Sequence, residues 1–383
     1  MVHNGKRMKR MAVGVLGFTL LIGALQPLSP LWANERDDGL TLEEAWSYAQ
    51  ENNAELRMVE EQLELAEARA KDAQEDLRYA KNRMSSEPQQ QVTFRKQEFT
   101  VPLSTEADVY DLTERKEELL LEVRLQLEST LSRLTVIETQ RESLFEEQGL
   151  AEERLAAQRK RTETGQDIPS SIGPYELELL QLEQRLTELN GQRELLLLDA
   201  AEALGMERKL LRKLERRPVP DITEYALPDI EELAERLSAS HVSVVLAEKR
   251  SVIAAKDYEI IQKAYQFNNP DHLNAIKDAE DQAFVARLAL RDAKLEAERK
   301  VRSDAQSIQN LADGVAIAQL NAELAEKQAE MDEKRRELGM ITNMELQQSK
   351  MQAESAVTAL AQAKIDLYAA VERFEFYIAN VEQ

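Results

Sequence analysis

The sequence predicts an all-α fold of long antiparallel helices that pack against one another in a coiled-coil-like manner, arranged in two tandem repeats. Glycine and proline are scarce, with 12 and 10 among 383 residues, so the chain has few places at which a helix must end. Only 5% of the residues are aromatic, whereas 31% are charged. This composition excludes collagen-like, low-complexity and turn-rich all-β classes, and it favours long helices packed side by side.

The N-terminal 33 residues have the three parts of a secretory signal peptide. They contain four basic residues, Lys6, Arg7, Lys9 and Arg10. An apolar run over 11–25 follows, and the region ends at Ala33, a small residue suited to cleavage. We expect residues 1–33 to be removed, so that the exported chain begins at Asn34. An uncleaved anchor is the alternative, although an apolar run of ~15 residues is short for a membrane span of ~20.

Prolines and one glycine divide the rest of the chain into six segments. The prolines after the signal peptide lie in four places, at 88–102, 169–174, 218–228 and 270. Because proline ends or starts a helix, we expect helices between these places, with one further turn at Gly339. The expected helical segments are 41–84, 106–165, 175–217, 229–266, 271–338 and 341–380.

Apolar side chains recur at spacings of three and four residues within the long segments, which indicates helices with one buried face. In segment 106–165 the stripe consists of Leu120, Val123, Leu127, Leu134, Ile137 and Leu144. In segment 175–217 it consists of Leu179, Leu182, Leu186, Leu189 and Leu196, and in 271–338 of Val301, Ala305, Ile308, Ala312 and Val315. At 1.5 Å per residue, the first and last of these segments would be roughly 90 and 100 Å long.

Two shifts of the sequence against itself indicate an internal duplication. A shift of 188 residues places Asn53 on His241 and Leu42-Glu43-Glu44 on Ile230-Glu231-Glu232 without a gap. A shift of 174 residues places Gly165 on Gly339. Each copy then has a start helix, a very long helix, a glycine turn and a returning helix. We predict a first helical repeat over 34–217 and a second over 218–383.

Two stretches carry a likeness to a known family. Leu40-Thr41-Leu42-Glu43-Glu44-Ala45, followed by the pair Asn52-Asn53, resembles the opening of the TolC family of efflux proteins, where a short helix ends and a second begins. Gly339-Met340-Ile341-Thr342-Asn343-Met344-Glu345-Leu346 is similar to the turn and returning helix of that family's second repeat. The likeness covers nearly all of 40–380. One departure is Ala54, where the family commonly has proline, although Asn53 can still cap the second helix.

A second departure lies where each repeat of the family inserts a β-hairpin that contributes to a membrane barrel. A spanning hairpin needs more than ~20 residues. The first copy offers only Gln91–Val101, which is charged at its middle, and the second offers only Gln266–Pro270. We therefore expect a barrel-less relative that lacks the transmembrane β-barrel strands, as in a bacterium without an outer membrane.

The sequence carries no recognisable catalytic, cofactor-binding or metal-binding motif. It has no cysteine, and neither His241 nor His272 stands in a Glu-x-x-His or His-x-x-x-His spacing. Gly-rich phosphate loops and nucleophile elbows are missing as well. We therefore expect a protein that is not an enzyme and has no cofactor and no metal. The net charge of −22 makes nucleic acid a poor partner.

Basic runs interrupt this acidic sequence at the ends of expected helices. One run, 208–217, contains Arg208, Lys209, Arg212, Lys213, Arg216 and Arg217. Two others, 159–161 and 334–336, precede the glycine turns. Cations stabilise helix C-termini, so each run has a structural explanation. Partner docking is the alternative. Because basic runs recur at equivalent positions before both glycine turns, docking is favoured more there than at 208–217.

The resemblance assigns a docking role to the glycine turns, which in the family form the tip of a helical tunnel where a membrane-fusion-type adaptor binds. The docking residues that it implies are Gly165, Gly339, Met340, Ile341 and Thr342. We expect Ile341 to be exposed and to act as an apolar anchor. Alternatively, both glycines only cap helices. The first turn is about four residues longer than the second and matches the family less well.

Taken together, the resemblance implies a TolC-like efflux or secretion component of the cell envelope, a passive helical conduit or adaptor-docking subunit with efflux transmembrane transporter activity. Its partners would be the adaptor and an inner pump or ABC transporter, and it would form a homo-oligomer, a trimer by resemblance. The expected location is the cell envelope or extracellular face, with the periplasm or outer membrane as the alternative. The competing function is an extracellular coiled-coil or cell-wall scaffold without transport.

Overall fold

The structure is a computed structural model that describes residues 40–81, 83, 85–265 and 269–382. The chain divides into two compact units, 1–39 and 40–383, and the description below concerns the second. The predicted signal peptide, 1–33, lies outside the described residues, as do residues 266–268.

The described chain is built of helices, as the sequence predicts. Up to Arg217 these are α1 (Leu42–Asn52), α2 (Ala54–Ala80), α3 (Pro88–Phe99), α4 (Val101–Glu163), the 3₁₀ turn η1 (Pro169–Ser171), α5 (Gly173–Leu204) and α6 (Arg208–Leu211). Residues 215–229 form an irregular linker. After the linker come α7 (Ile230–Ser240), α8 (Val242–Ala264), α9 (Pro270–Glu337) and α10 (Asn343–Glu382). No helix within the described ranges has an apolar stretch long enough to span a membrane.

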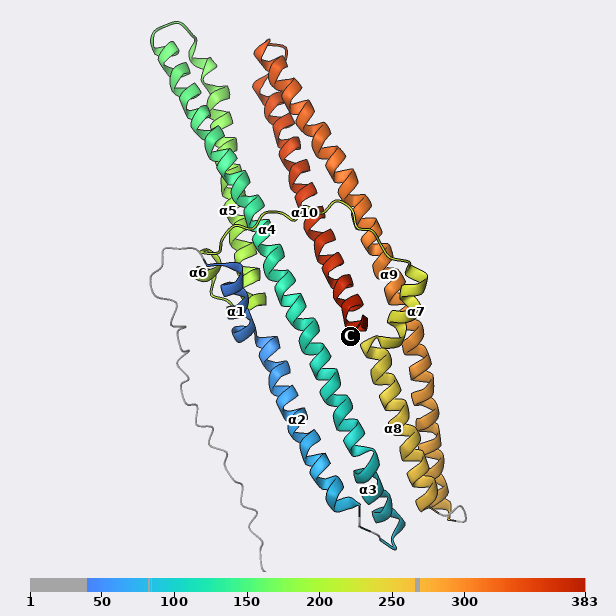
Figure 1. The fold of residues 1–383 in the computed structure, drawn as a ribbon. Coiled ribbons are helices and arrows are strands. Elements are labelled where there is room, and N and C mark those ends of the chain that lie inside the picture. Colours follow the sequence, from blue (N-terminus) through green and yellow to red (C-terminus); the bar gives the residue numbers. More distant parts are fainter. Residues whose placement is uncertain (1–39, 82, 84, 266–268, 383) are drawn as a thin grey trace, which may run out of the picture. The chain divides into compact units, whose positions relative to one another are not determined.

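The two longest helices organise the packing. α4 contacts α2 and α3 along its first part and α5 along its second, while α9 contacts α8 and then α10 (Figure 1). Segment Gln91–Val101, which the sequence analysis considered as a weak strand, is helical in α3 and at the start of α4. In the described residues the only strand-like pairing is an isolated bridge between Leu40 and Leu214.

We call the helices before the linker the first half and those after it the second half. In each half the second helix begins with a side-chain cap. The Asn53 side chain accepts a hydrogen bond from the backbone N–H of Leu56 at 2.9 Å and so caps α2. His241 caps α8 in the same way, because its Nδ1 accepts from the backbone N–H of Ser243 at 3.2 Å. Both caps stand at the two positions that the 188-residue shift superposes. The division into two repeats stays a prediction.

Gly205 ends α5 well before the limit of the predicted segment 175–217. Its φ of +62° lies in the left-handed region that favours glycine. A Cβ at this position would lie 2.5 Å from the carbonyl oxygen of Asn52, and the Asn53 amide donates to the carbonyl of Ala203 at 2.7 Å. The end of α5 is therefore held against the α1–α2 junction. The prediction of one continuous helix to residue 217 is wrong for this reason.

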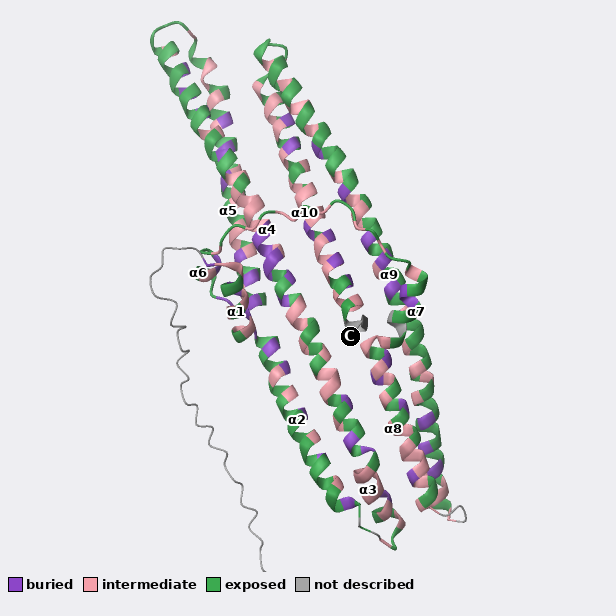
Figure 2. Ribbon diagram, in the orientation of Figure 1, coloured by how far each residue is buried: buried purple, intermediate pink, exposed green. Residues whose placement is uncertain are grey.

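Apolar cores lie separately in the two halves of the chain. Figure 2 shows buried residues along the contact faces of α4, α5, α9 and α10. One core joins α1, α4, α5 and α6 around Leu127 and Leu204, and a smaller one joins α4 and α5 farther along. A third joins α7, α9 and α10 around Ile308 and Leu367. The buried members include most of the predicted stripe positions, so the helical periodicity is confirmed.

The two halves meet where α3 and α4 contact α8 and where α4 contacts α10, and the α4–α10 contact is a polar seam. Its contacts are Lys350–Glu147 (3.9 Å), Gln140–Thr358, Arg133–Asp366 (3.6 Å), Tyr368–Glu128 (3.1 Å), Arg373–Glu122 (2.8 Å) and Tyr377–Glu118 (2.8 Å). Residue numbers rise on α10 as they fall on α4, so the helices are antiparallel. None of the three buried core clusters extends across this seam.

Candidate functional site

Two helical hairpins, α4–α5 and α9–α10, end in glycine turns on the same side of the unit (Figure 1). Gly165 has φ +77° and Gly339 has φ +71°. In both turns the residue after glycine donates its N–H to a carbonyl in the last helical turn, from Gln166 at 2.9 Å and from Met340 at 2.8 Å. This is the Schellman pattern that satisfies helix C-termini. Both glycines are helix caps, whatever else the turns do.

The first turn is held together by a buried polar side chain. Gln158, only 7% exposed, donates to Asp167 at 3.0 Å and to Ser171 at 2.6 Å. These bonds fold residues 164–172 back onto α4, with η1 inside the loop. Ile168 is left 68% exposed at its apex. The longer first turn is thus an ordered loop that presents one apolar side chain.

The second turn is tighter and leads directly into a capped helix. The backbone N–H of Glu345 donates to the Thr342 hydroxyl at 3.2 Å, and the Thr342 N–H donates to the Glu345 carboxylate at 2.7 Å. This reciprocal pair is a capping box, the same device that Thr41 and Glu44 form at α1. Hydrogen bonds from Thr342, the backbone bond first, lower the pKa of Glu345. Thr342 is therefore a structural residue of this turn.

The most exposed apolar side chains of the second turn are those of Leu338 and Met340, whereas the sequence pointed to Ile341. Leu338 is 75% exposed and Met340 is 71% exposed. Ile341 is only partly exposed, so it presents less apolar surface than these two neighbours, and its role as an anchor stays a prediction. Its neighbours in the turn are exposed because Gly339 turns the chain between them. An apolar contact with a partner would fall first on Leu338 and Met340.

Basic side chains surround both turns, and some of them already have partners in the chain. Arg159 pairs with Glu176 of the returning helix at 2.8 Å, and Arg335 pairs with Asp332 at 3.3 Å. Arg336 donates to the Asn343 side chain across the second turn. Lys160, Arg161 and Lys334 are exposed. The turns thus combine apolar apices with nearby cationic side chains.

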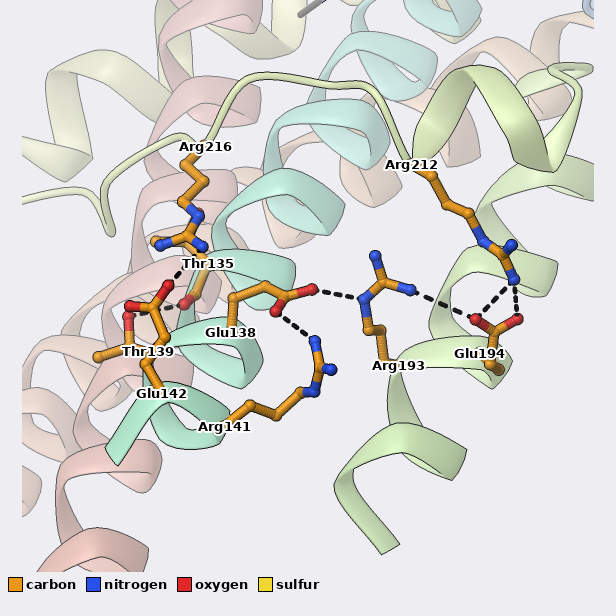
Figure 3. Close-up of polar contacts among 9 residues, drawn as sticks. All are labelled: Thr135, Glu138, Thr139, Arg141, Glu142, Arg193, Glu194, Arg212 and Arg216. Atoms are coloured by element: carbon orange, nitrogen blue, oxygen red, sulfur yellow. Dashed lines mark hydrogen bonds and ion pairs between the residues drawn. The ribbon is translucent and has the colours of Figure 1, made fainter. Parts of the chain in front are cut away.

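The other basic run, 208–217, binds carboxylates of the same chain. Arg212 contacts Glu194 of α5 at 2.6 Å, and Arg216 contacts Glu142 of α4 at 2.6 Å (Figure 3). Arg208 also contacts Glu194. Hydrogen bonds from Arg212 and Arg216 lower the pKa of Glu194 and of Glu142, respectively. The run therefore fastens the start of the linker to α4 and α5, which gives it a structural role without a partner protein.

A buried carboxylate joins the linker, α4 and α10. Glu128 is 4% exposed and lies 3.1 Å from Arg124 and 2.9 Å from Arg217, and it accepts a hydrogen bond from the Tyr368 hydroxyl at 3.1 Å. Burial, and then the charge of Glu128, raises the pKa of Tyr368 to about 12. This group could not be found from the sequence, because its members are far apart along the chain.

Both described histidines have structural partners. His241 caps α8, and its pKa is lowered first by burial and then by Lys300. The His272 ring stacks on Tyr265 with 4.5 Å between ring centroids. In the part of the chain that the structure describes, no group of three or more His, Cys, Asp or Glu side chains could hold a metal ion.

The fold described above is similar to that of solved outer-membrane channels of the TolC type. The outer membrane protein VceC from Vibrio cholerae superposes with a TM-score of 0.62 at 12% sequence identity, covering 88% of this chain and 95% of that one. The Campylobacter jejuni CmeC outer membrane channel gives 0.60 at 12% identity, covering 91% and 90%. The outer-membrane channel OprN gives 0.62 at 14% identity, covering 88% and 90%.

Comparisons at the level of sequence find no such relative. No protein-family model matches the chain, and no curated protein matches it. At 11–14% identity the structural likeness establishes the fold and leaves the function to be argued from the site.

Proposed function

We propose that the protein is a TolC-like component of a cell-envelope efflux or secretion system, a passive helical conduit or adaptor-docking subunit. The observation that carries the proposal is the TolC-type fold, which places two glycine-capped hairpin turns on one side of the unit. The solved channels VceC, OprN and CmeC share that fold along most of their length. The export signal expected at 1–33 supports a location in the cell envelope or at the extracellular face.

The proposed docking site consists of the two turns. At the second turn, Gly339 fixes the backbone, Met340 and Leu338 present apolar surface, and Thr342 fixes the start of α10. At the first turn, Gly165 and the exposed Ile168 take the corresponding places. Flexible, polarizable methionine suits a surface that must adapt to a partner. The partner is a membrane-fusion-type adaptor, linked to an inner pump or ABC transporter that supplies the energy.

A homo-oligomer, most simply a trimer, would cover apolar surface that one chain leaves exposed. On α5 the exposed residues include Leu177, Leu180, Leu195 and Leu198, and on α9 they include Ile317, Leu320 and Leu324. Repeated exposure of large apolar side chains on helix faces is typical of surfaces that pack against another chain. A ring of such hairpins would enclose the lumen of a conduit.

The oligomeric state decides between conduit and scaffold. Mass measurement of the mature chain in solution, alone and with a candidate adaptor, should give a closed oligomer that takes up the adaptor in a fixed ratio. Monomers, dimers or open bundles without adaptor binding would favour the extracellular scaffold.

The docking turn has its own test. Met340→Asp should abolish adaptor binding while changing the free energy of unfolding by no more than about 0.5 kcal/mol, because the side chain is 71% exposed. Met58→Asp in α2 is the matched control, since Met58 is 56% exposed and lies far from both turns in sequence. Adaptor binding that survives Met340→Asp, or that is lost equally with Met58→Asp, would contradict docking at this turn.

A further inference from the structure

A cleft lies at the end of the polar seam where Tyr377 contacts Glu118, between α4 and the junction of α7 with α8. It has a volume of about 320 Å³ and is lined by side chains from α4, α7, α8, α9 and α10. That volume is at the small end of the ~300–1,000 Å³ typical of ligand pockets. Asp304 in its wall is separated from Gly339 by roughly 50 Å along α9, so the cleft is distinct from the docking turns.

Aromatic side chains gather in this cleft although the chain has few of them. The whole sequence contains 8 Phe, 9 Tyr and 2 Trp. Four of these line the cleft, namely Tyr110, Phe374, Phe376 and Tyr377. The cores elsewhere are built mainly of Leu, Ala, Val and Ile, as expected for helices packed closely side by side. The aromatic wall is therefore a local feature of the cleft.

Carboxylates outnumber basic groups in the same lining. The acids are Asp111, Glu114, Glu118 and Asp304, and the bases are Arg115 and Lys300. Burial, and then the charge of Glu117, raises the pKa of Glu114, and burial raises the pKa of Asp304 more than Lys300 lowers it. The lowered pKa of His241 keeps that imidazole neutral near pH 7. The cleft thus has a negative potential and would repel an anion.

The side chain of Lys300 already places a positive charge against this aromatic surface. The Lys300 ammonium lies 4.6 Å from the centroid of the Tyr377 ring and 3.4 Å from the Tyr377 hydroxyl. The same hydroxyl donates to Glu118 at 2.8 Å. Lys300 is exposed and reaches this position on a flexible side chain. A positive charge therefore already lies on the aromatic face of Tyr377, beside the carboxylates of the lining.

We propose that the cleft binds a small organic cation with an apolar or aromatic substituent, whose positive head displaces the Lys300 ammonium from Tyr377. The substituent packs among the aromatic side chains, while the head lies between Glu118 and Asp304. A quaternary or protonated amine meets these requirements. Lys300 turns out to solvent when the ligand enters. This site is independent of the proposed transport function and requires neither adaptor nor pump.

The test uses benzyltrimethylammonium as the probe, with benzyl alcohol and benzoate as neutral and anionic comparators. Isothermal titration calorimetry on the purified full chain should detect binding of the cation and not of the other two. Lys300→Ala should tighten binding several-fold, because it removes the competing ammonium. The double variant Glu118→Gln, Asp304→Asn should weaken binding at least about tenfold. Glu153→Gln, at an exposed glutamate elsewhere on α4, is the matched control and should bind as the wild type does.

Three results would overturn the proposal. These are failure of the cation to bind, equal binding of benzyl alcohol, and weaker binding by Lys300→Ala. The lysine variant is informative even if the double acid variant does not fold, since Lys300 is exposed and its truncation leaves the cores intact. The readout is binding by the isolated chain, so failure of adaptor docking would leave this result unchanged.

Discussion

Gly205→Ala should destabilise the protein far more than the same change at Gly165 or Gly339. All three glycines have φ between +62° and +77°. An alanine in that conformation costs about 1–2 kcal/mol. A Cβ meets nothing within 4 Å at Gly165 or Gly339, so these two variants measure the backbone cost alone.

At Gly205 two further costs are added. The Cβ would lie 2.5 Å from the Asn52 carbonyl oxygen and 2.8 Å from its carbonyl carbon, both backbone atoms. Restoring van der Waals contact requires a shift of roughly 1 Å between α5 and the α1–α2 junction, at the ~1–3 kcal/mol typical of overpacking. The shift would also strain the 2.7 Å hydrogen bond from Asn53 to Ala203, worth about 1 kcal/mol. The expected total is about 3–6 kcal/mol.

Urea unfolding of the three alanine variants, followed by helix circular dichroism, provides the assay. Gly205→Ala should lower the free energy of unfolding by at least about 2 kcal/mol more than either control. If all three variants lose the same amount, the close approach of α5 to Asn52 does not limit the residue at 205, and the explanation for the end of α5 fails.

Glu128→Gln should lower the free energy of unfolding by about 2–3 kcal/mol, because it leaves the partly buried Arg217 without its charge partner. It should also lower the pKa of Tyr368 from about 12, and an unchanged phenol titration by absorbance would assign that shift to burial alone. Asn53→Ala should cost about 2 kcal/mol through the lost cap and the lost bond to α5, and a cost below ~0.5 kcal/mol would contradict both. Hydrogen bonds from two lysines lower the pKa of Glu259 from 4.5 to about 2, so its contribution to stability is present above pH 4.5 and disappears as the pH falls toward 2. The free energies of unfolding of the wild type and Glu259→Gln should therefore converge at low pH. A difference between them that grows on acidification would contradict the lowered pKa of Glu259.

Much of the fold follows from local signals in the sequence. Prolines mark the starts of α3 and α9 and lie within the first turn of α4, while glycines cap α4 and α9. These devices act on the backbone next to them, so a single sequence reveals them. The buried stripe through Val301, Ala305 and Ile308 is likewise a property of one helix. Helix α3 was not predicted because apolar residues in Gln91–Val101 follow neither the helical nor the strand periodicity.

The rest depends on contacts between distant parts of the chain. From the sequence, Gly205 looks like a glycine that is tolerated inside a helix. Only the packing of the α1–α2 junction against it shows that a side chain does not fit there. The acids that bind Arg216 and Arg217 are Glu142 and Glu128, both more than 70 residues away, so the basic run resembled a docking surface. The exposure of Met340 rather than Ile341 depends on how the turn packs onto α9 and α10. Sequence spacing carries no information about such pairings.

The polar seam between α4 and α10 should yield more easily than an apolar contact, so it would give compliance to one part of the contact between the halves of the chain. Sliding one apolar core past another would open voids, which close-packed interiors resist. Along the seam, by contrast, direct contacts such as Arg373–Glu122 can be exchanged for water-mediated ones at little cost in free energy. We therefore expect slow relative motion of the hairpins to grow with ionic strength, while hydrogen exchange inside each hairpin stays protected.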